Sequence, residues 1–186
     1  MTEEGRCRCG WCNLNNPLYV RYHDEEWGVP QYGDDKLYEM LLLEPFQAGL
    51  SWETILKKRE FFRRAFDGFD PVKISRYGEE KIGSLLQDPG IVRNRRKIEA
   101  AVNNAAVFLQ IQREFGAFRN YIWGFTQGAV LYETNKTSSS LSDLVSSDLQ
   151  QRGMRFVGTT IVYSYLQAVG VIQSHEPGCF LHRCRL

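Results

Sequence analysis

Four side chains of the kind that bind metal ions lie in two pairs near opposite ends of the 186-residue sequence. The first pair is Cys9 and His23, and the second pair is His175 and Cys179. Thiolate sulfur and imidazole nitrogen are common zinc ligands, and a site with four protein ligands has no open position for catalysis. If all four bind one ion, we expect a structural zinc site that fastens the two ends together.

Other cysteines and histidines leave the ligand set open. Cys9 and Cys12 have the Cys-x-x-Cys spacing of a zinc knuckle, and this pairing would leave His23 free. Additional candidate ligands outside the two pairs are Cys7, Cys12, His182 and Cys184. An odd number of cysteines, accompanied by histidines at ligand spacing, favours a reduced cytosolic protein over a disulfide scaffold.

A carboxylate beside an apolar run is the second feature that could support chemistry. Glu44 ends this run, and Pro45 is expected to hold the Glu44 backbone in extended geometry. Gly49 allows a tight loop from which Leu50 could project, although composition alone favours Leu50 as a core residue. The Glu44 carboxylate could also be a helix cap or one half of a salt bridge.

Aromatic side chains are concentrated in the same part of the sequence. They are Trp11, Tyr19, Tyr22, Trp27 and Trp52. Such rings more often belong to a core, but rings beside a carboxylate could hold a flat, electron-poor ligand by stacking and cation–π attraction.

Two basic clusters could contact a polyanion. The first follows Gly90, in a predicted turn between two helices, and contains Arg93, Arg95, Arg96 and Lys97. Glycine permits close approach of the backbone, and the N-terminus of the next helix favours an anion such as phosphate. The second cluster contains Lys57, Lys58, Arg59, Arg63 and Arg64. Both are compatible with a nucleic-acid backbone, although a solvated helix face has the same composition.

The elements that position these residues are predicted to be helices, so the expected fold class is all-α. Apolar residues recur at helical spacing over residues 35–43, 51–66, 79–87, 92–115, 140–152 and 159–169. Ser51 is a predicted N-cap, and Ser140 with Asp143 resembles a capping box. Residues 126–139 are the predicted long loop.

The composition is ordinary for a soluble globular protein, with 43% hydrophobic and 24% charged residues. The formal net charge of +1 neither demands nor forbids a polyanionic partner. The polar, acidic start does not have the pattern of a signal peptide. The most apolar stretch, residues 156–172, is too short and too polar for a membrane span and favours a buried helix.

Several ordered blocks resemble DNA-3-methyladenine glycosylase I, a family of helix-hairpin-helix DNA glycosylases that removes 3-methyladenine from alkylated DNA. The blocks are Cys9-Gly-Trp11, Pro17-Leu-Tyr19, Tyr22-His-Asp24, Glu26-Trp-Gly-Val-Pro30, Leu43-Glu44, Gln47-Ala-Gly-Leu-Ser-Trp52, Asp88-x-Gly-Ile-Val-Arg93, Phe156-Val-Gly-Thr-Thr160 and His175-x-x-x-Cys179. They cover nearly the whole chain, so a chance match is not a reasonable explanation.

The resemblance implies a single domain over residues 1–186, with two helical lobes around one cleft and the helix-hairpin-helix at about 79–98. It implies structural zinc at Cys9, His23, His175 and Cys179. The family often has glycine where this chain has Pro45, so we expect the path of the Glu44 segment to differ.

The resemblance also implies roles for the pocket and the DNA-facing residues. Glu44 would be the catalytic residue and would recognise the base together with Tyr22, while Trp52 would stack on it. The pocket wall would be made of Trp11, Tyr19 and Trp27. The DNA-binding residues would be Gly49, Leu50, Gly90, Arg93, Arg95 and Lys97.

The implied reaction is the flipping and hydrolytic release of 3-methyladenine, which leaves an abasic site without a lyase step. The expected partner is double-stranded alkylated DNA, with no membrane, and we expect a monomer in the bacterial cytoplasm. The alternative is a non-catalytic, zinc-fastened module that binds damaged DNA. The hairpin and the metal are common to both, so only the Glu44 pocket separates them. A zinc hydrolase is disfavoured because four protein ligands leave no activated water.

Overall fold

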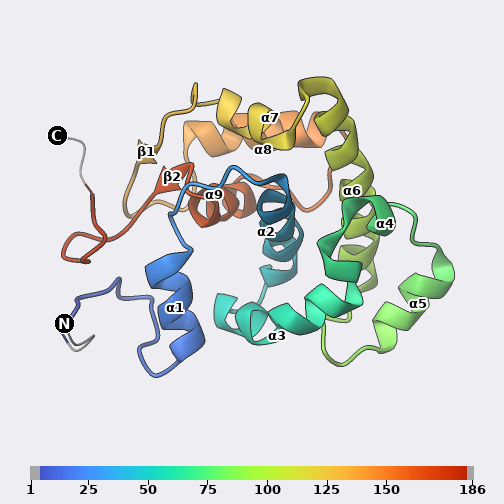
Figure 1. The fold of residues 1–186 in the computed structure, drawn as a ribbon, viewed down its shortest axis with the longest axis horizontal. Coiled ribbons are helices and arrows are strands. Elements are labelled where there is room, and N and C mark those ends of the chain that lie inside the picture. Colours follow the sequence, from blue (N-terminus) through green and yellow to red (C-terminus); the bar gives the residue numbers. More distant parts are fainter. Residues whose placement is uncertain (1–4, 184–186) are drawn as a thin grey trace.

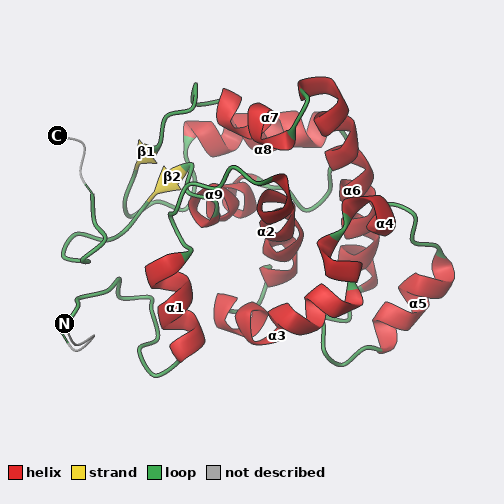
Figure 2. Cartoon of the chain, viewed as in Figure 1, coloured by secondary structure: helices red, strands yellow, loops and turns green. Residues whose placement is uncertain are grey.

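The structure is a computed structural model that describes residues 5–183, and helices dominate it (Figures 1 and 2). The all-α fold class predicted from the sequence is confirmed. The helices are α1 (Pro17–Glu25), α2 (Asp34–Gln47), α3 (Trp52–Ala65), α4 (Pro71–Ile74), α5 (Glu79–Gln87), α6 (Arg95–Phe115), α7 (Phe118–Gly124), α8 (Ser140–Gln151) and α9 (Thr159–Ala168), with a 3₁₀ turn, η1 (Asp67–Phe69).

Two short strands join distant parts of the chain. β1 (Leu131–Tyr132) pairs in parallel with β2 (Ile172–Gln173), with Leu131 opposite Ile172. β1 lies within the predicted loop over residues 126–139, and β2 follows α9. This pairing holds the loop beside the segment that carries His175 and Cys179.

The helices α2 and α9 lie at the centre of the molecule and pack against each other (Figure 1). Every residue of α2 from Leu37 to Phe46 is buried, and α9 buries Val162, Tyr163, Tyr165 and Leu166. Burial of these apolar side chains supplies the main driving force for assembly. The central pair therefore gives a rigid support for any polar side chain that it carries.

The helix α2 departs from the prediction at its C-terminal end. It continues to Gln47 with Pro45 inside it, so the expectation that Pro45 extends the Glu44 backbone is wrong. Proline removes one helix hydrogen bond and crowds the preceding turn. Leu43 and Phe46 are fully buried on either side of it, and this packing outweighs the local preference of the proline. Glu44 consequently projects from a helix and not from a loop.

Several helix boundaries also differ from the prediction. The helices α1 and α7 were not predicted, although Asn16 caps α1 and is followed by Pro17, a recognisable start signal. α6 begins at Arg95 and not at residue 92, because Asn94 is its N-cap. The predicted N-cap Ser51 is confirmed, since its side chain accepts a hydrogen bond from the backbone N–H of Thr54.

The capping box of α8 lies one residue earlier than predicted. Ser139 and Ser142 exchange side-chain and backbone hydrogen bonds there, in place of Ser140 and Asp143. The Asp143 carboxylate instead accepts a hydrogen bond from the hydroxyl of Thr159 on α9.

Across residues 5–183, no helix combines the length and the apolar character that crossing a lipid bilayer requires.

Candidate active site and metal cluster

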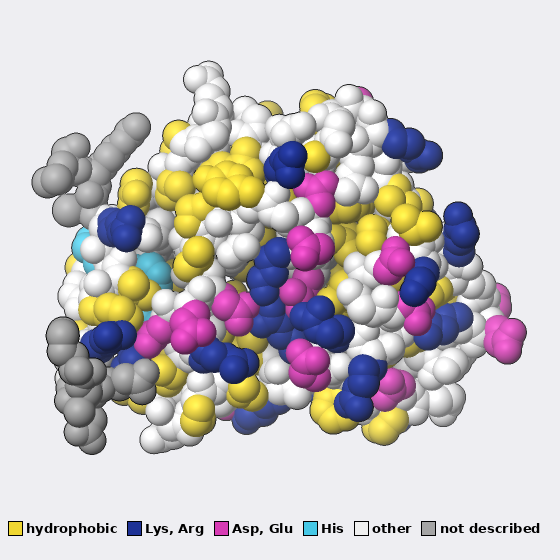
Figure 3. Space-filling model, viewed as in Figure 1, with side chains coloured by type: hydrophobic (Ala, Val, Ile, Leu, Met, Phe, Trp, Pro, Cys, Tyr) yellow, Lys and Arg dark blue, Asp and Glu magenta, His cyan; other side chains and the backbone are white. Residues whose placement is uncertain are grey.

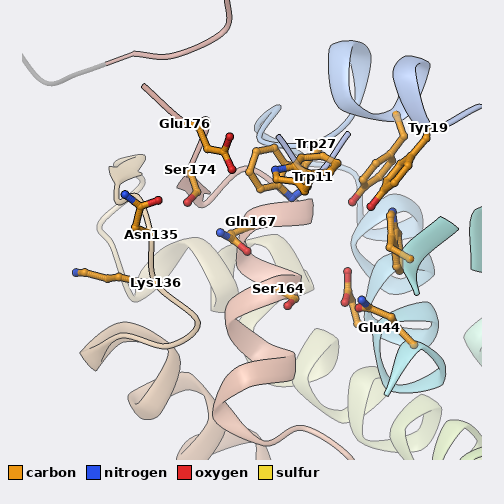
Figure 4. A pocket seen from close by; sticks show the side chains of 13 residues that line it. Trp11, Tyr19, Trp27, Glu44, Asn135, Lys136, Ser164, Gln167, Ser174 and Glu176 are labelled. Carbon is orange, nitrogen blue, oxygen red and sulfur yellow. The ribbon is translucent and has the colours of Figure 1, made fainter. Parts of the chain in front are cut away.

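A cavity of about 270 Å³ opens between α1, α2, α3 and α9 (Figure 4). Its lining includes all of the predicted pocket residues, which are Trp11, Tyr19, Tyr22, Trp27, Glu44 and Trp52. The structure therefore brings together side chains that are separated by up to 41 positions (from 11 to 52) in the sequence. The roles assigned to them above stay predictions.

The carboxylate of Glu44 is the chemically unusual group of this cavity. The residue is only 4% exposed, and its Oε2 atom is buried without a hydrogen-bond partner among the described residues. Burial raises the pKa of the Glu44 carboxyl from 4.5 to about 8. An acceptor that is buried and unpartnered is costly, so this position is suited to a ligand that supplies a donor or a positive charge.

Two aromatic side chains face this carboxylate from neighbouring helices. Tyr22 on α1 and Trp52 on α3 have their ring centroids 5.3 Å apart, at an interplanar angle of 48°. The Nε1 donor of Trp52 has no partner within residues 5–183. Burial, and then the charge of Glu44, raise the pKa of Tyr22, so its hydroxyl stays protonated. A flat ligand beside Glu44 would meet an aromatic face and the unpartnered Nε1 donor of Trp52.

The other aromatic residues form one wall of the cavity. Trp11 packs at 4.8 Å against Trp27 and at 5.4 Å against Tyr19, measured between ring centroids. Edge-to-face and tilted contacts of this kind add to the burial of the rings. The wall is consequently a set of mutually packed aromatic rings.

The opposite side of the cavity is polar and was not predicted. Ser164 lies on the side of α9 that faces Glu44, whereas Gln167 points toward the far rim, where Asn135 and Lys136 lie (Figure 4). Gln47, Ser174 and Glu176 complete the lining. A usable signal was present for α9, where Ser164 and Gln167 are three positions apart and therefore lie near each other on a largely buried helix. No comparable signal marks the rim residues.

The four candidate metal ligands converge on one point. Cys9, His23, His175 and Cys179 are all buried, and their ligand atoms lie within 4.8 Å of one another. The Sγ atom of Cys9 is 3.5 Å from Nδ1 of His175, and the Sγ atom of Cys179 is 3.5 Å from Nε2 of His23. The cluster could hold a metal ion, and it joins the segment before α2 to the segment after β2.

The surroundings of the histidines orient them as ligands. Nδ1 of His23 is 2.7 Å from the Asp24 carboxylate, which Arg8 holds at 2.6 Å. This contact turns Nε2 of His23 toward the cluster, the usual arrangement behind a metal-bound histidine. Burial lowers the pKa of His175 to about 4, so its ring is neutral, and burial raises the pKa of the Cys9 thiol to about 12. A bound cation would supply the charge that the Cys9 thiolate needs.

The alternative ligands do not join this cluster. Cys12 is absent from the group found among the described residues, and its thiol contacts the backbone oxygen of Tyr19, so the zinc-knuckle pairing is wrong. Cys7 is exposed, and Nδ1 of His182 lies 2.7 Å from the backbone oxygen of His175. Cys184 lies outside the described residues.

The metal cluster and the pocket share a wall. The Trp27 indole meets the His175 ring edge-on at 4.7 Å, and Trp11 lies 5.2 Å from the His23 ring. The rings that face the cavity on one side therefore contact the candidate ligands on the other.

The hairpin between α5 and α6 packs closely against α3 at Gly90. A Cβ atom at Gly90 would lie 2.8 Å from the Phe61 ring on α3 and 2.9 Å from the Asp88 carboxylate, so only glycine fits. Arg93 is exposed in this turn, and Arg95 is half-exposed beside Glu79 and Glu99. Arg93 is therefore accessible to an anion, whereas Arg95 would have to share its guanidinium between an anion and these carboxylates.

Lys97 behaves differently from the arginines. It is only 6% exposed, and its ammonium donates hydrogen bonds to the backbone oxygens of Phe46 (3.1 Å) and Ala48 (2.6 Å). The expectation that it faces DNA conflicts with this position, because the side chain folds inward under α2. Charge in the sequence does not report this direction.

The second basic cluster is largely paired with acidic groups. Arg59 binds Glu26 and Glu39 at 2.9 and 2.8 Å, and Arg63 also binds Glu39 at 2.8 Å. Positive and negative side chains accordingly alternate across the face shown in Figure 3. The network ties α1, α2 and α3 together instead of forming a uniform basic surface.

The α2–α3 loop presents an apolar side chain to solvent. Gly49 has a φ of +82°, a conformation that favours glycine, and Leu50 is 42% exposed. The alternative that Leu50 fills the core is therefore wrong. The loop lies between Glu44 and Trp52 in the chain, so its position and that of the pocket are linked.

The fold and the site define a class of all-α proteins in which an acidic, aromatic cavity adjoins a buried cluster of two cysteines and two histidines. The family model for methyladenine glycosylase matches residues 11–182. The chain belongs to the methyladenine glycosylase family. It is 48% identical over 179 residues to DNA-3-methyladenine glycosylase 1 of Escherichia coli (strain K12), covering 92% of this chain and 95% of that protein.

Other comparisons agree with this assignment. The DNA-3-methyladenine glycosylase of Haemophilus influenzae is 37% identical over 178 residues, covering 92% of this chain and 96% of that protein. A crystal structure of 3-methyladenine DNA glycosylase I has a TM-score of 0.91 at 44% identity, covering 95% of this chain and 100% of the other. A variant of such an enzyme in complex with 3-methyladenine has a TM-score of 0.88 at 34% identity, covering 95% and 99%.

Proposed function

We propose that this protein is a DNA-3-methyladenine glycosylase that removes 3-methyladenine from alkylated DNA in base excision repair. The observation that carries the proposal is the Glu44 carboxyl, which is buried in an aromatic cavity with one oxygen unpartnered. Membership of the methyladenine glycosylase family supports the same substrate. The reaction class is hydrolysis of an N-glycosidic bond.

The charge of the substrate explains why such a cavity suffices. Methylation at N3 gives the purine a delocalised positive charge, which weakens its bond to the sugar because the base departs neutral. A strong acid is therefore unnecessary. A base must leave the duplex before it can react, at a cost of a few kcal/mol, and weakened pairing lowers that cost.

The side chains of the cavity have different roles in binding the base and in breaking its bond to the sugar. A cationic base favours the ionised form of Glu44, whose carboxylate accepts a hydrogen bond from the exocyclic amine. The same charge stabilises the positive sugar that forms as the bond breaks, which makes Glu44 the catalytic residue. Stacking on Trp52 contributes about 1–3 kcal/mol per base, while Tyr22 contacts the base edge. The Trp11, Tyr19 and Trp27 wall limits the cavity to a flat purine.

We further propose that the metal held by the cluster is structural zinc. Zinc bonds of about 2.3 Å to sulfur and 2.05 Å to nitrogen, in a tetrahedron, separate the two ligand atoms by about 3.6 Å. The sulfur–nitrogen distances of 3.5, 3.5 and 3.6 Å within the cluster fit this value. Four protein ligands leave no coordination position for a reacting water.

The DNA-facing residues are proposed from their exposure. Gly90, Arg93 and Arg95 would contact the phosphate backbone, and the Gly49–Leu50 loop would enter the base stack beside the flipped nucleotide. The DNA would be double-stranded and would be bound by a monomer, in the cytoplasm with the chromosome. We infer a monofunctional enzyme that leaves an intact abasic site.

A base-release assay tests the proposal. Methylated duplex DNA is incubated with the protein, and the released bases are separated by chromatography. Free 3-methyladenine is the expected product, with release reduced at least about a hundredfold by Glu44→Gln because the developing charge loses its partner. Binding of methylated DNA without base release would instead support the non-catalytic damage-binding module.

The absence of a lyase step has its own readout. Product strands are expected to stay intact until treated with alkali, and borohydride is expected to trap no covalent adduct. Lys136 lines the rim of the cavity and pairs with Glu133 at 3.3 Å, so it is the amine to examine first. A borohydride adduct that disappears in Lys136→Met would overturn the monofunctional assignment.

A further inference from the structure

Two lysines connect the Leu50 loop and the α5–α6 hairpin in a reciprocal way. Lys97, on the helix that follows the hairpin, donates to the backbone oxygens of Phe46 and Ala48 at the start of the Leu50 loop. Lys58, on the helix that follows the Leu50 loop, donates to the backbone oxygens of Pro89 (2.8 Å) and Gly90 (3.2 Å) in the hairpin. Each segment thus supplies one ammonium group to the other, and both loops border α3 (Figure 1).

The contact around these lysines is close and leaves little freedom. The Phe61 ring on α3 packs against Gly90 so tightly that a Cβ atom there would lie within 2.8 Å of it. The Lys97 ammonium lies at the C-terminal end of α2, where helix carbonyls carry partial negative charge and favour a cation. Its burial leaves the backbone oxygens as its partners, and a phosphate is excluded from this position.

We infer that Lys58 and Lys97 are positioning residues that fix the separation between the Leu50 loop and the hairpin. When the hairpin docks on the DNA backbone, this fixed separation determines where Leu50 enters the base stack. The inference rests on the proposed glycosylase function. It assigns the lysines to the flipping step and to neither phosphate binding nor recognition of the base.

The inference predicts a specific pattern for Lys58→Met and Lys97→Met. Release of 3-methyladenine from methylated duplex DNA is expected to fall about tenfold or more, since a displacement of about 1 Å can cost that much or more. Release from methylated single-stranded DNA, which has no base pair to open, is expected to change less than about twofold. The ratio of the two rates is therefore the measured quantity.

Two further readouts separate positioning from other roles. The affinity for free 3-methyladenine, followed by the fluorescence of the pocket tryptophans, is expected to stay within about twofold in both variants, because the cavity keeps its lining. The slope of log affinity for DNA against log salt is expected to stay unchanged in both variants. A phosphate-binding lysine would lower that slope by about one.

Matched controls make the result decisive. Arg93→Met, in the exposed turn, is the control for loss of a phosphate contact and is expected to lower the salt slope. Lys73→Met, on α4, tests the effect of removing an exposed lysine elsewhere and is expected to change neither quantity. Thermal unfolding shows that each variant is folded, and Lys58→Met, at a half-buried site, tests the inference if Lys97→Met unfolds.

Three outcomes would overturn the inference. They are an unchanged duplex-to-single-strand ratio, a lowered salt slope in the lysine variants, or loss of free-base binding. Failure of the wild-type protein to release 3-methyladenine from any substrate would instead overturn the proposed function, so the two failures are distinguishable.

Discussion

Glu44 shows how one buried carboxyl can be set for a cationic ligand. Its pKa of about 8 comes from burial, because no positive side chain within residues 5–183 compensates it. Near neutral pH a carboxyl group with this pKa is mostly protonated, and a bound cation reverses this balance by favouring the carboxylate. A neutral purine offers no such charge, so the same carboxyl contributes to the choice of substrate.

The free energy of unfolding should depend on pH because of the raised pKa of Glu44. The folded state holds the Glu44 proton more tightly than the unfolded chain, so its stabilising contribution is complete below about pH 4.5 and is lost as the pH rises to about 8. The glutamine in the Glu44→Gln variant cannot ionise. The variant should therefore have the same Tm as the wild type at about pH 5 and a higher Tm at about pH 9, where its free energy of unfolding should be larger by a few kcal/mol. Thermal unfolding across this range measures the difference, and a difference that is independent of pH would contradict the assignment.

Activity should depend on pH in the opposite sense. Only the ionised fraction of free enzyme can receive the cation, so kcat/KM for 3-methyladenine release should rise up to about tenfold per pH unit and level off above about pH 8. Initial rates at low substrate concentration provide the measurement. A profile that is flat between pH 6 and 8 would show that Glu44 does not titrate in this range.

For single residues, the sequence predicts the chemistry of a side chain better than it predicts where that side chain points. Cysteine and histidine are rare and have few roles, so type and spacing marked the candidate ligands, while the family resemblance was needed to select the four that converge. Lys97 was predicted to face DNA because it follows three arginines in a basic run, yet its side chain is buried under α2. Only the packing of α6 against α2 decides which way this side chain points.

The hairpin is an element whose geometry depends on one glycine. Gly90→Ala would place a methyl group within 3 Å of Phe61 and Asp88, which requires the turn to move away from α3. We expect a loss of about 1–3 kcal/mol in stability and at least about tenfold weaker DNA binding, because the turn can no longer present its backbone. Thermal unfolding and DNA titration measure the two effects.

Gly83 provides the matched control for that substitution. It lies inside α5, and a Cβ atom there would meet nothing within 4 Å. Gly83→Ala should therefore raise stability by roughly 0.5–1 kcal/mol, because alanine favours the helix. Equal effects of the two substitutions would show that the close contact at Gly90 is unimportant.

The elements themselves were largely predictable where periodicity and caps agree. α3, α5 and α9 match their predicted ranges because regular apolar spacing extends over most of each helix. α2 was predicted too short because a local rule for proline was applied at Pro45, where burial on all sides prevails. α1 was not predicted because its few apolar residues give little periodicity, although Asn16-Pro17 marked its start.

At the scale of the molecule, the cluster of Cys9, His23, His175 and Cys179 joins the segment before α2 and the segment after β2 to the pocket wall. Removing the ion with a chelator, or replacing a ligand by Cys179→Ala, should lower Tm by about 10 °C, because a structural site contributes several kcal/mol. Cys7→Ala is the control, since Cys7 is exposed and outside the cluster. Mass spectrometry of the purified protein measures its metal content and identifies the ion. The zinc proposal would be refuted if the protein contained no metal and if its Tm were the same with and without the chelator.

The assembly of the pocket was predictable only through the family resemblance. Periodicity places helices along the chain, but it does not state that α1, α2 and α3 converge on one cavity with α9. The rim residues Asn135, Lys136 and Glu176 come from loops whose positions depend on the β1–β2 pairing and on the cluster. Such long-range contacts have no local signature in a single sequence.

The order in which the chain is synthesised gives the cluster a further consequence. Ribosomes make Cys9 and His23 first, and α2 through α9 all follow before His175 and Cys179 emerge. Trp27 in the cavity wall packs against His175, so this wall can be completed only after His175 has been synthesised. A nascent or prematurely terminated chain would therefore contain Glu44 and Trp52 but would lack the completed wall of the cavity. We expect such a chain to be inactive on DNA until Cys179 has been synthesised.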